Sequence, residues 1–138
     1  MTAPPSPGAP WTLQFHESEV RAVAASGSRL TVHLAAARLA PRGRVLGQGS
    51  EDAYLRHVDL ILDGAHWSGQ PSACLGRLSE GHWSDGTEWR ARFVAPEAIE
   101  GAIRLALSFT QGERLDVHAT SWQVRLHPDS HLLAAYAC

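Results

Sequence analysis

Apolar and polar side chains alternate along much of the chain with the two-residue period of a β-strand. Over residues 29–35, Leu30, Val32 and Leu34 share one face, and polar residues occupy the other. The same alternation recurs over residues 102–109 and 114–119. Residues 53–63 carry apolar side chains on both faces, which is typical of a strand covered partly on both sides. No long stretch has the 3.6-residue period of a helix. The pattern predicts an all-β fold.

Turn dipeptides separate these strands: Ser26-Gly27, Asp63-Gly64, Asp85-Gly86 and Gln111-Gly112. Glycine adopts the positive φ angles that tight hairpin turns need, and Asp-Gly is typical of the type I′ turn. Ser18 and Glu19 beside His16 predict a strand-to-strand corner. We therefore expect an antiparallel meander of about eight to ten strands that closes into a small barrel or a two-sheet roll or sandwich.

Three stretches leave room for a short helical turn: residues 41–50, 96–101 and 129–137. The stretch 96–101 begins with Pro96 and Glu97 and ends with Gly101. Proline and an acidic residue are typical of the start of a helical turn, and glycine is typical of its end. We expect at most one or two such turns.

Two segments, 26–39 and 111–126, share the motif Gly-x-Arg-Leu-x-Val-His. Each follows an extended stretch, so each is expected to form the second strand of a hairpin. In both, the apolar face changes partway, as at a β-bulge or a barrel corner. The apolar positions are 30, 32 and 34 followed by 37 and 39, and 115, 117 and 119 followed by 122, 124 and 126. Convergence of two amphipathic strands explains the likeness. In the alternative, a pseudo-symmetric barrel or sandwich, His33 and His118 face each other.

The 138 residues are the length of one domain. Residues 1–10 are rich in Pro, Ala, Gly and Ser and predict a disordered leader; 11–128 form a single all-β domain, and 129–138 a C-terminal tail. The leader lacks the features of a signal peptide, and no apolar run is long enough to span a bilayer. We expect a soluble, cytoplasmic protein. Arginine supplies all 12 Lys and Arg cations, a bias of GC-rich, bacterial-type sequences.

The net charge of −2 offers no broad electrostatic surface for nucleic acid or an anionic membrane, so neither partner is expected. Cys74 and Cys138 are expected to be free thiols, because one lies in the tail. The chain has no G-x-S-x-G elbow and no phosphate-binding glycine loop. We therefore predict no catalytic residue and no cofactor.

The tripeptide His-Trp-Ser occurs at 66–68 and at 82–84, with Cys74 midway. His66, Cys74 and His82 are ligand types that zinc accepts, and Asp63, Glu80 or Asp85 could supply a fourth. The long spacing is not typical of a metal-binding loop, so this metal site is a speculative alternative.

Turn positions argue against a duplicated site. A two-residue turn at Asp63-Gly64 would place His66 opposite Ile61 and Trp67 opposite Leu60. A two-residue turn at Asp85-Gly86 would place His82 opposite Trp89 and Trp83 opposite Glu88. One tripeptide then leaves a turn and the other enters one.

Aromatic and cationic residues gather between positions 67 and 92, and such a group is typical of a ligand-binding face. In the alternative, Trp89, Ala91 and Phe93 point into the core. Arg90 and Arg92, which alternate with them in sequence, then face the solvent. The candidate ligand-binding residues are Trp67, Trp83, Trp89, Arg90, Arg92, His66 and His82.

The hypothesis that best fits these observations is a non-enzymatic binding or protein-interaction module. Its edge strands, or the loop 40–52, would meet a protein partner or a second copy of the chain. One alternative is a barrel that holds a small ligand in a mouth lined by Trp and Arg. The other is a metal-dependent protein that uses His66, Cys74 and His82.

Overall fold

The computed structural model describes residues 10–40, 52–128, 130 and 132–135. This part of the chain is nearly all β-strand, which confirms the predicted fold class. The strands are β1 (Trp11–Ser26), β2 (Arg29–Leu39), β3 (Asp52–Asp63), β4 (His66–Ser68), β5 (Gly76–Ser84), β6 (Trp89–Arg90), β7 (Arg92–Ala95), β8 (Glu97–Phe109), β9 (Arg114–Leu126) and β10 (Leu132–Ala135). A single 3₁₀ turn, η1 (Pro71–Ala73), is the only helical element described, and no described helix has the length and apolarity needed to cross a membrane.

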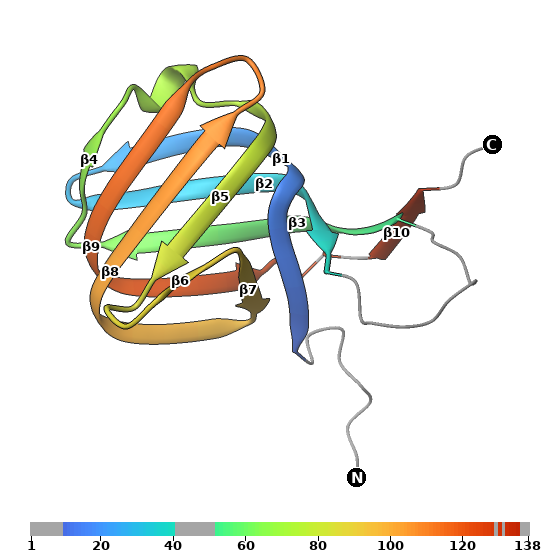
Figure 1. Cartoon of the computed structure of the whole chain (residues 1–138). Helices are drawn as coiled ribbons and strands as arrows, with labels where there is room; N and C mark the ends of the chain where they lie inside the picture. The colour runs from blue at the N-terminus through green and yellow to red at the C-terminus, as the bar shows by residue number, and fades with distance from the viewer. Residues whose placement is uncertain (1–9, 41–51, 129, 131, 136–138) are drawn as a thin grey trace, which may run out of the picture.

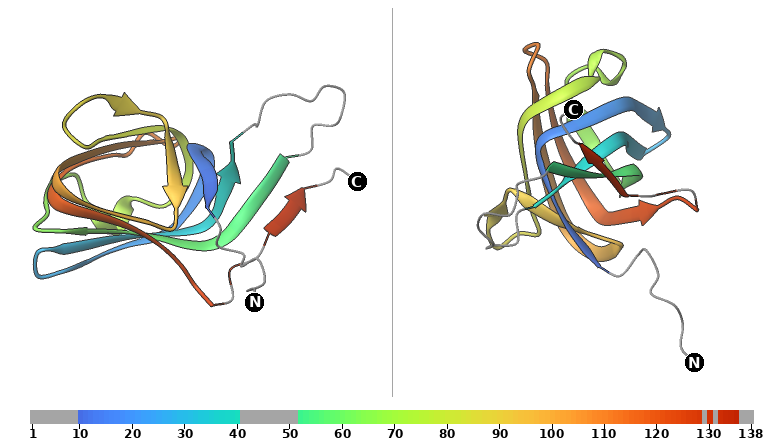
Figure 2. Two further views of the ribbon diagram at one scale, coloured as in Figure 1. Left: turned by 90° about the horizontal axis from the view of Figure 1, so that it is seen from below. Right: turned by 90° about the vertical axis from the view of Figure 1, so that its right-hand side faces the viewer.

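Six antiparallel strands form a closed barrel in the order β3, β2, β1, β5, β8 and β9 (Figure 1). The ring closes because β3 pairs with β2 on one edge and with β9 on the other. The remaining strands lie outside this ring: β4 pairs with β9, β6 with β5, β7 with β1 and β10 with β3. Figure 2 shows the barrel from below, with the ends of β2 and β3 and the whole of β10 extending to one side.

Large side chains fill the barrel. Trp122, Phe15 and Phe93 are fully buried, together with the inward leucines, valines and isoleucine of the six strands. A barrel of about eight strands has an interior just wide enough for side chains, so one of six strands leaves less room still. The interior is therefore a packed core, and a binding site has to lie at an end of the barrel or on its outer surface.

Three of the four predicted turns join neighbouring strands. Ser26 lies opposite Arg29 across a hairpin whose Gly27 has a φ of +62°. Gly112 lies in the β8–β9 turn, and Asp85-Gly86 in the loop between β5 and β6. These three hairpins confirm that the chain reverses at the predicted turns. The two-residue register expected at Asp85-Gly86 is wrong, however, because Trp83 lies opposite Arg90 instead of Glu88, and Trp89 lies opposite Ser84 instead of His82.

The fourth turn prediction, at Asp63-Gly64, is wrong. Asp63 lies opposite Ser121, and His66 lies opposite His118, so the chain continues along β9 without reversing. A Cβ atom on Gly64 would lie 2.3 Å from the Thr120 hydroxyl oxygen, and its φ is +63°. Glycine is therefore needed here for close approach to β9. The expected partners of His66 and Trp67, Ile61 and Leu60, are replaced by His118 and Val117.

The helical turn predicted at 96–101 is also wrong, because these residues belong to β8, apart from Pro96 before it. Glu97 lies opposite Val124 and Glu100 opposite Ser121, so the backbone hydrogen-bonds to β9 instead of to itself. In the tail, Leu132–Ala135 pairs with β3 and forms no helix. Residues 41–50, the leader up to residue 9 and Cys138 lie outside the described residues.

The predicted change of apolar face is confirmed in both similar segments. On β2 the buried side chains are Leu30, Val32 and Leu34, followed by Ala37. On β9 they are Leu115, Val117 and Ala119, followed by Trp122 and Val124. Both strands are the second strand of a hairpin, as expected. The proposed pairing of His33 with His118 is wrong, because β3 lies between β2 and β9.

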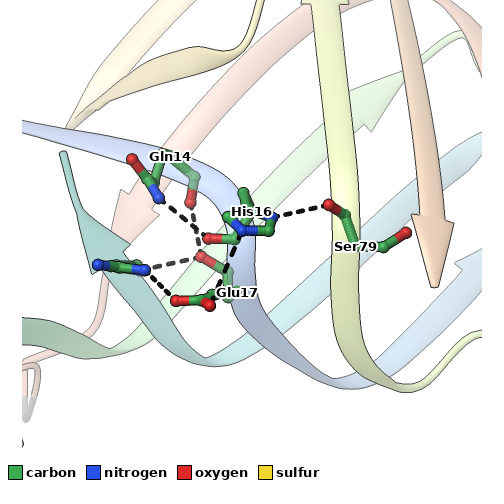
Figure 3. A network of polar contacts seen from close by, with 6 residues as sticks. Gln14, His16, Glu17 and Ser79 are labelled. Atoms are coloured by element: carbon green, nitrogen blue, oxygen red, sulfur yellow. Dashed lines mark hydrogen bonds and ion pairs between the residues drawn. The ribbon is translucent and has the colours of Figure 1, made fainter. Parts of the chain in front are cut away.

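The corner predicted near His16 is a bulge in β1, where the pairing with β2 changes register between Gln14 and Glu19 (Figure 3). Ser18 is fully buried; its hydroxyl donates to the Gln14 carbonyl at 2.7 Å and accepts from the Arg38 amide at 2.9 Å. Glu17 forms an ion pair with the Arg38 guanidinium, and a His16 ring nitrogen contacts the Ser79 carbonyl on β5 at 2.8 Å. Side chains thus replace backbone pairing at the corner.

Replacing Ser18 by alanine is expected to lower the free energy of unfolding by about 1–3 kcal/mol, because a buried amide and carbonyl lose their partner. Urea unfolding followed by circular dichroism measures the loss. Ser26→Ala, at the exposed end of β1, is the control and should leave stability nearly unchanged. Equal midpoints for both variants would contradict the structural role of the Ser18 hydroxyl.

Candidate functional site

The three tryptophans of the predicted ligand-binding face lie in different environments. Trp83 is only 2% exposed, whereas Trp89 is 48% exposed, and Trp67 is half-buried against the core. The alternative with Trp89 and Ala91 in the core is therefore wrong, although Phe93 is buried as it expected.

Loop length explains the exposure of Trp89. Ser84 pairs with Trp89 and Trp83 with Arg90, so four residues, not two, connect β5 to β6. The Asp85 carboxylate accepts hydrogen bonds from the hydroxyl and the amide of Thr87, and these bonds lower the pKa of Asp85. The longer loop places Trp89 beside the outward-facing Ser84, on the solvent side.

One end of the barrel holds what we call the barrel-end cluster: Trp83, Trp122, Asp85, Arg90 and Glu97. The Trp83 and Trp122 rings are stacked at 4.6 Å with an interplanar angle of 2°. Phe93 contacts Trp122 edge-on at 6.5 Å, and the Trp83 indole N–H donates to the Arg92 carbonyl at 2.8 Å. These contacts fix both indole rings in place.

Charged groups surround this stack. The Arg90 guanidinium lies 5.2 Å from the Trp83 ring centre and 3.5 Å from both the Asp85 and the Glu88 carboxylates. Burial raises the pKa of Glu97; the positive charge of Arg90 opposes the rise, and the negative charge of Asp85 adds to it. One arginine thus faces several carboxylates, and Glu97 is the one most removed from water.

Two buried side-chain atoms in the described part of the chain lack a hydrogen-bond partner: Glu97 Oε1 and Trp122 Nε1. Both belong to the barrel-end cluster. Glu97 also lines an open groove of about 530 Å³, together with Pro96, Ala98, Gln123, Val124, Arg125 and Leu126; Trp122 precedes the lining residue Gln123 in sequence but does not itself line the groove. Buried polar groups in proteins are nearly always hydrogen-bonded. Two unpartnered atoms in one cluster, one of them on a residue that lines a groove, mark this end as a candidate binding site.

Glu97→Gln is expected to stabilise the protein at neutral pH and to have little effect in acid. Because its pKa is raised on folding, the folded state holds this proton more tightly than the unfolded chain does. Stability therefore falls as the pH rises from the ordinary carboxyl range through the raised pKa, and glutamine removes that loss. Thermal melts at about pH 4 and about pH 7.5 measure it. A difference between variant and wild type that is the same at both pH values would contradict the assignment.

A second candidate surface lies on the outer wall formed by β4, β9, β8 and β5. His66 lies opposite His118, His118 opposite Arg104, and Arg104 opposite Ser84, next to Trp89. The exposed side chains of this line, Trp89, Arg104, His118 and His66, are called the outer row. The Arg104 guanidinium lies 5.2 Å from the Trp89 ring centre. Together the two side chains cover Ser84, which is 5% exposed although it faces outward.

The predicted metal ligands do not come together. His66 on β4 and His82 on β5 have two strands between them, a separation of about 14 Å. Cys74 is fully buried, and burial raises the pKa of its thiol, with the charge of Glu113 adding to the rise. Among residues 10–40, 52–128 and 130, no group of three His, Cys, Asp or Glu side chains is placed to hold a metal ion.

A third polar group joins β2, β3 and the segment after β9. Asp59, 8% exposed, contacts a His33 ring nitrogen at 2.7 Å and a His127 ring nitrogen at 2.8 Å, each through a different carboxylate oxygen. The Ser130 hydroxyl donates to the His57 carbonyl at 2.7 Å and holds the same segment. Neither the His33 nor the His127 ring bonds to a serine or cysteine nucleophile within the described residues. The geometry fits an anchor for the chain after β9.

Sequence reasoning missed Glu97, Arg104, Asp59 and His127. The local sequence predicts a helical turn at Glu97, and the roles of the other three residues depend on which strands become neighbours. Asp59 did carry a signal, because a carboxylate in the apolar stretch 58–62 needs partners once it is buried.

Comparison with protein-family models, curated proteins and solved structures finds no match for the chain.

Proposed function

We propose that the protein is a non-enzymatic interaction module that binds an acidic segment of a partner protein on the outer row. The observation that carries this proposal is Trp89, a large apolar side chain left half exposed, with the Arg104 guanidinium over its ring. Tryptophan and arginine are the residues most enriched among those that dominate binding energies at interfaces.

The charges of the outer row favour an acidic partner. Its four side chains are one indole, one guanidinium and two imidazoles, and none is a carboxylate. On β9, Asp116, two positions before His118, forms an ion pair with Arg114 at 3.2 Å, so the two charges neutralise each other. A carboxylate of a partner would form an ion pair with the Arg104 guanidinium, while an apolar side chain next to that carboxylate would pack on the Trp89 ring.

The test uses the full chain labelled with ¹⁵N and two synthetic peptides, one alternating glutamate with leucine and one alternating lysine with leucine. We expect the acidic peptide to shift the indole N–H signal of Trp89, with an affinity that falls as salt is added. Trp89→Ala and Arg104→Ala should each weaken binding by about tenfold or more.

Arg21→Ala is the matched control, because Arg21 is exposed on β1, on another part of the wall. Equal binding of both peptides, or full binding by Trp89→Ala, would refute the proposal. Light scattering covers one further outcome: self-association that Trp89→Ala abolishes would replace the acidic partner with a second copy of the chain.

A further inference from the structure

We infer a second binding site, separate from the outer row, in which Glu97 and Trp122 recognise an aliphatic hydroxyl group of a small molecule. The two residues supply complementary halves of one hydrogen-bonding site. Trp122 Nε1 is a buried donor without an acceptor, and Glu97 Oε1 is a buried acceptor without a donor. A hydroxyl accepts and donates at once, so a single group satisfies both.

Strand register places the two side chains on the same face. Glu97 lies opposite Val124, and Ile99 lies opposite Trp122, so Glu97 and Trp122 are diagonal neighbours across β8 and β9. Diagonal neighbours have Cβ atoms about 7 Å apart. Two hydrogen bonds through one bridging oxygen span about 5.5 Å, which lies within the reach of a glutamate and an indole from such positions.

The donor is held rigidly before any ligand arrives. Trp122 is fully buried, stacked on Trp83 and met edge-on by Phe93. Its N–H direction is therefore fixed by packing, and little conformational entropy is lost when an acceptor binds.

The groove that Glu97 lines offers space for the rest of such a molecule. Four of its other lining residues are apolar, Pro96, Ala98, Val124 and Leu126, and two are polar, Gln123 and Arg125. In the proposed site the apolar side chains cover a carbon skeleton, while Glu97 meets the hydroxyl. The Glu97 carboxylate disfavours a bare anion. The positive charges of Arg90, which acts on Glu97, and of Arg125, which lines the groove, disfavour a bare cation. A neutral polyol or sugar is the ligand class that remains.

Indole N–H signals of the ¹⁵N-labelled full chain give the test, since the five tryptophans provide internal references. Glycerol and glucose are the hydroxyl probes, and 1,2-dimethoxyethane, which accepts hydrogen bonds but donates none, is the comparison. We expect a saturable shift of the Trp122 signal with the hydroxyl probes alone, while the exposed Trp89 signal stays unchanged.

Glu97→Ala should weaken this binding by about tenfold, as expected for loss of a hydrogen bond to a charged group. Glu100→Ala, an exposed carboxylate on the same strand, should bind as wild type does. A thermal melt and the other four indole signals check that each variant is folded. Overturning results are a shift that never saturates, wild-type affinity in Glu97→Ala, or a water molecule on the Trp122 N–H that no probe displaces.

Discussion

Replacing Trp122 by alanine is expected to lower the free energy of unfolding by about 3–5 kcal/mol, whereas the same change at Trp89 should cost at most about 1 kcal/mol. Trp122 has no exposed surface and lies in the middle of the aromatic core, against Trp83 and Phe93. Removing its indole leaves a cavity that the surrounding strands cannot close. At Trp89 only an exposed contact with Arg104 is lost.

Guanidinium unfolding followed by far-ultraviolet circular dichroism measures both variants on the same scale. The pair is a matched control, because the deleted atoms are identical and only burial differs. If both variants lowered the denaturation midpoint by the same amount, Trp122 would not be the buried core residue and Trp89 the exposed one. If Trp122→Ala fails to fold, Trp122→Phe keeps most of the buried area and should show an intermediate loss.

The strands themselves could be predicted because their signal is local. In β2 and β9, the alternation of apolar and polar residues and the change of apolar face are visible within a short stretch of consecutive residues. Both agree with the observed burial. A barrel corner turns the strand without ending it, so the inward positions shift by one while the apolar pattern continues.

Strand neighbours could not be predicted in the same way, because pairing depends on segments far apart in sequence. Asp63-Gly64 has the chemistry of a hairpin turn, but β9, more than 50 positions further along, provides the partner for both β3 and β4. Likewise the pattern at Pro96 fits a helical turn, yet β9 offers this segment a strand to pair with. Tertiary pairing outweighs local preference at both places.

The candidate sites divide along the same line. The tryptophans and Arg90 were found from their residue types and closeness in sequence, but which indole is exposed depends on two extra loop residues. Glu97 and Arg104 join the sites only through the register of β8 with β9 and β5. The clustering of Trp and Arg in the sequence thus indicates the part of the chain that contains the candidate sites. The strand register determines which of their side chains come into contact.

Gly64→Ala is expected to cost about 2–4 kcal/mol, and Gly27→Ala about 1–2 kcal/mol, although the two glycines have nearly the same φ. The φ angles are +63° and +62°, so the strain of placing a Cβ in the left-handed region is common to both. Around Gly27 nothing lies within 4 Å of the added atom, whereas at Gly64 it meets the Thr120 hydroxyl at 2.3 Å. The difference between the variants is the cost of forcing β9 away.

Thr120→Ala separates the steric clash with Thr120 from the strain of a Cβ atom at a positive φ. It removes the hydroxyl, which also donates to the Asp63 carbonyl at 3.2 Å, and leaves only the Thr120 Cβ position, 3.2 Å from the new atom. In that background Gly64→Ala should cost about as much as Gly27→Ala does alone, so the double-mutant cycle has a coupling energy of about 1–2 kcal/mol. Strictly additive losses would mean that the chain between β3 and β4 does not press against β9. A reversal at Asp63-Gly64, which the sequence suggests, would leave no reason for Thr120 to matter at all.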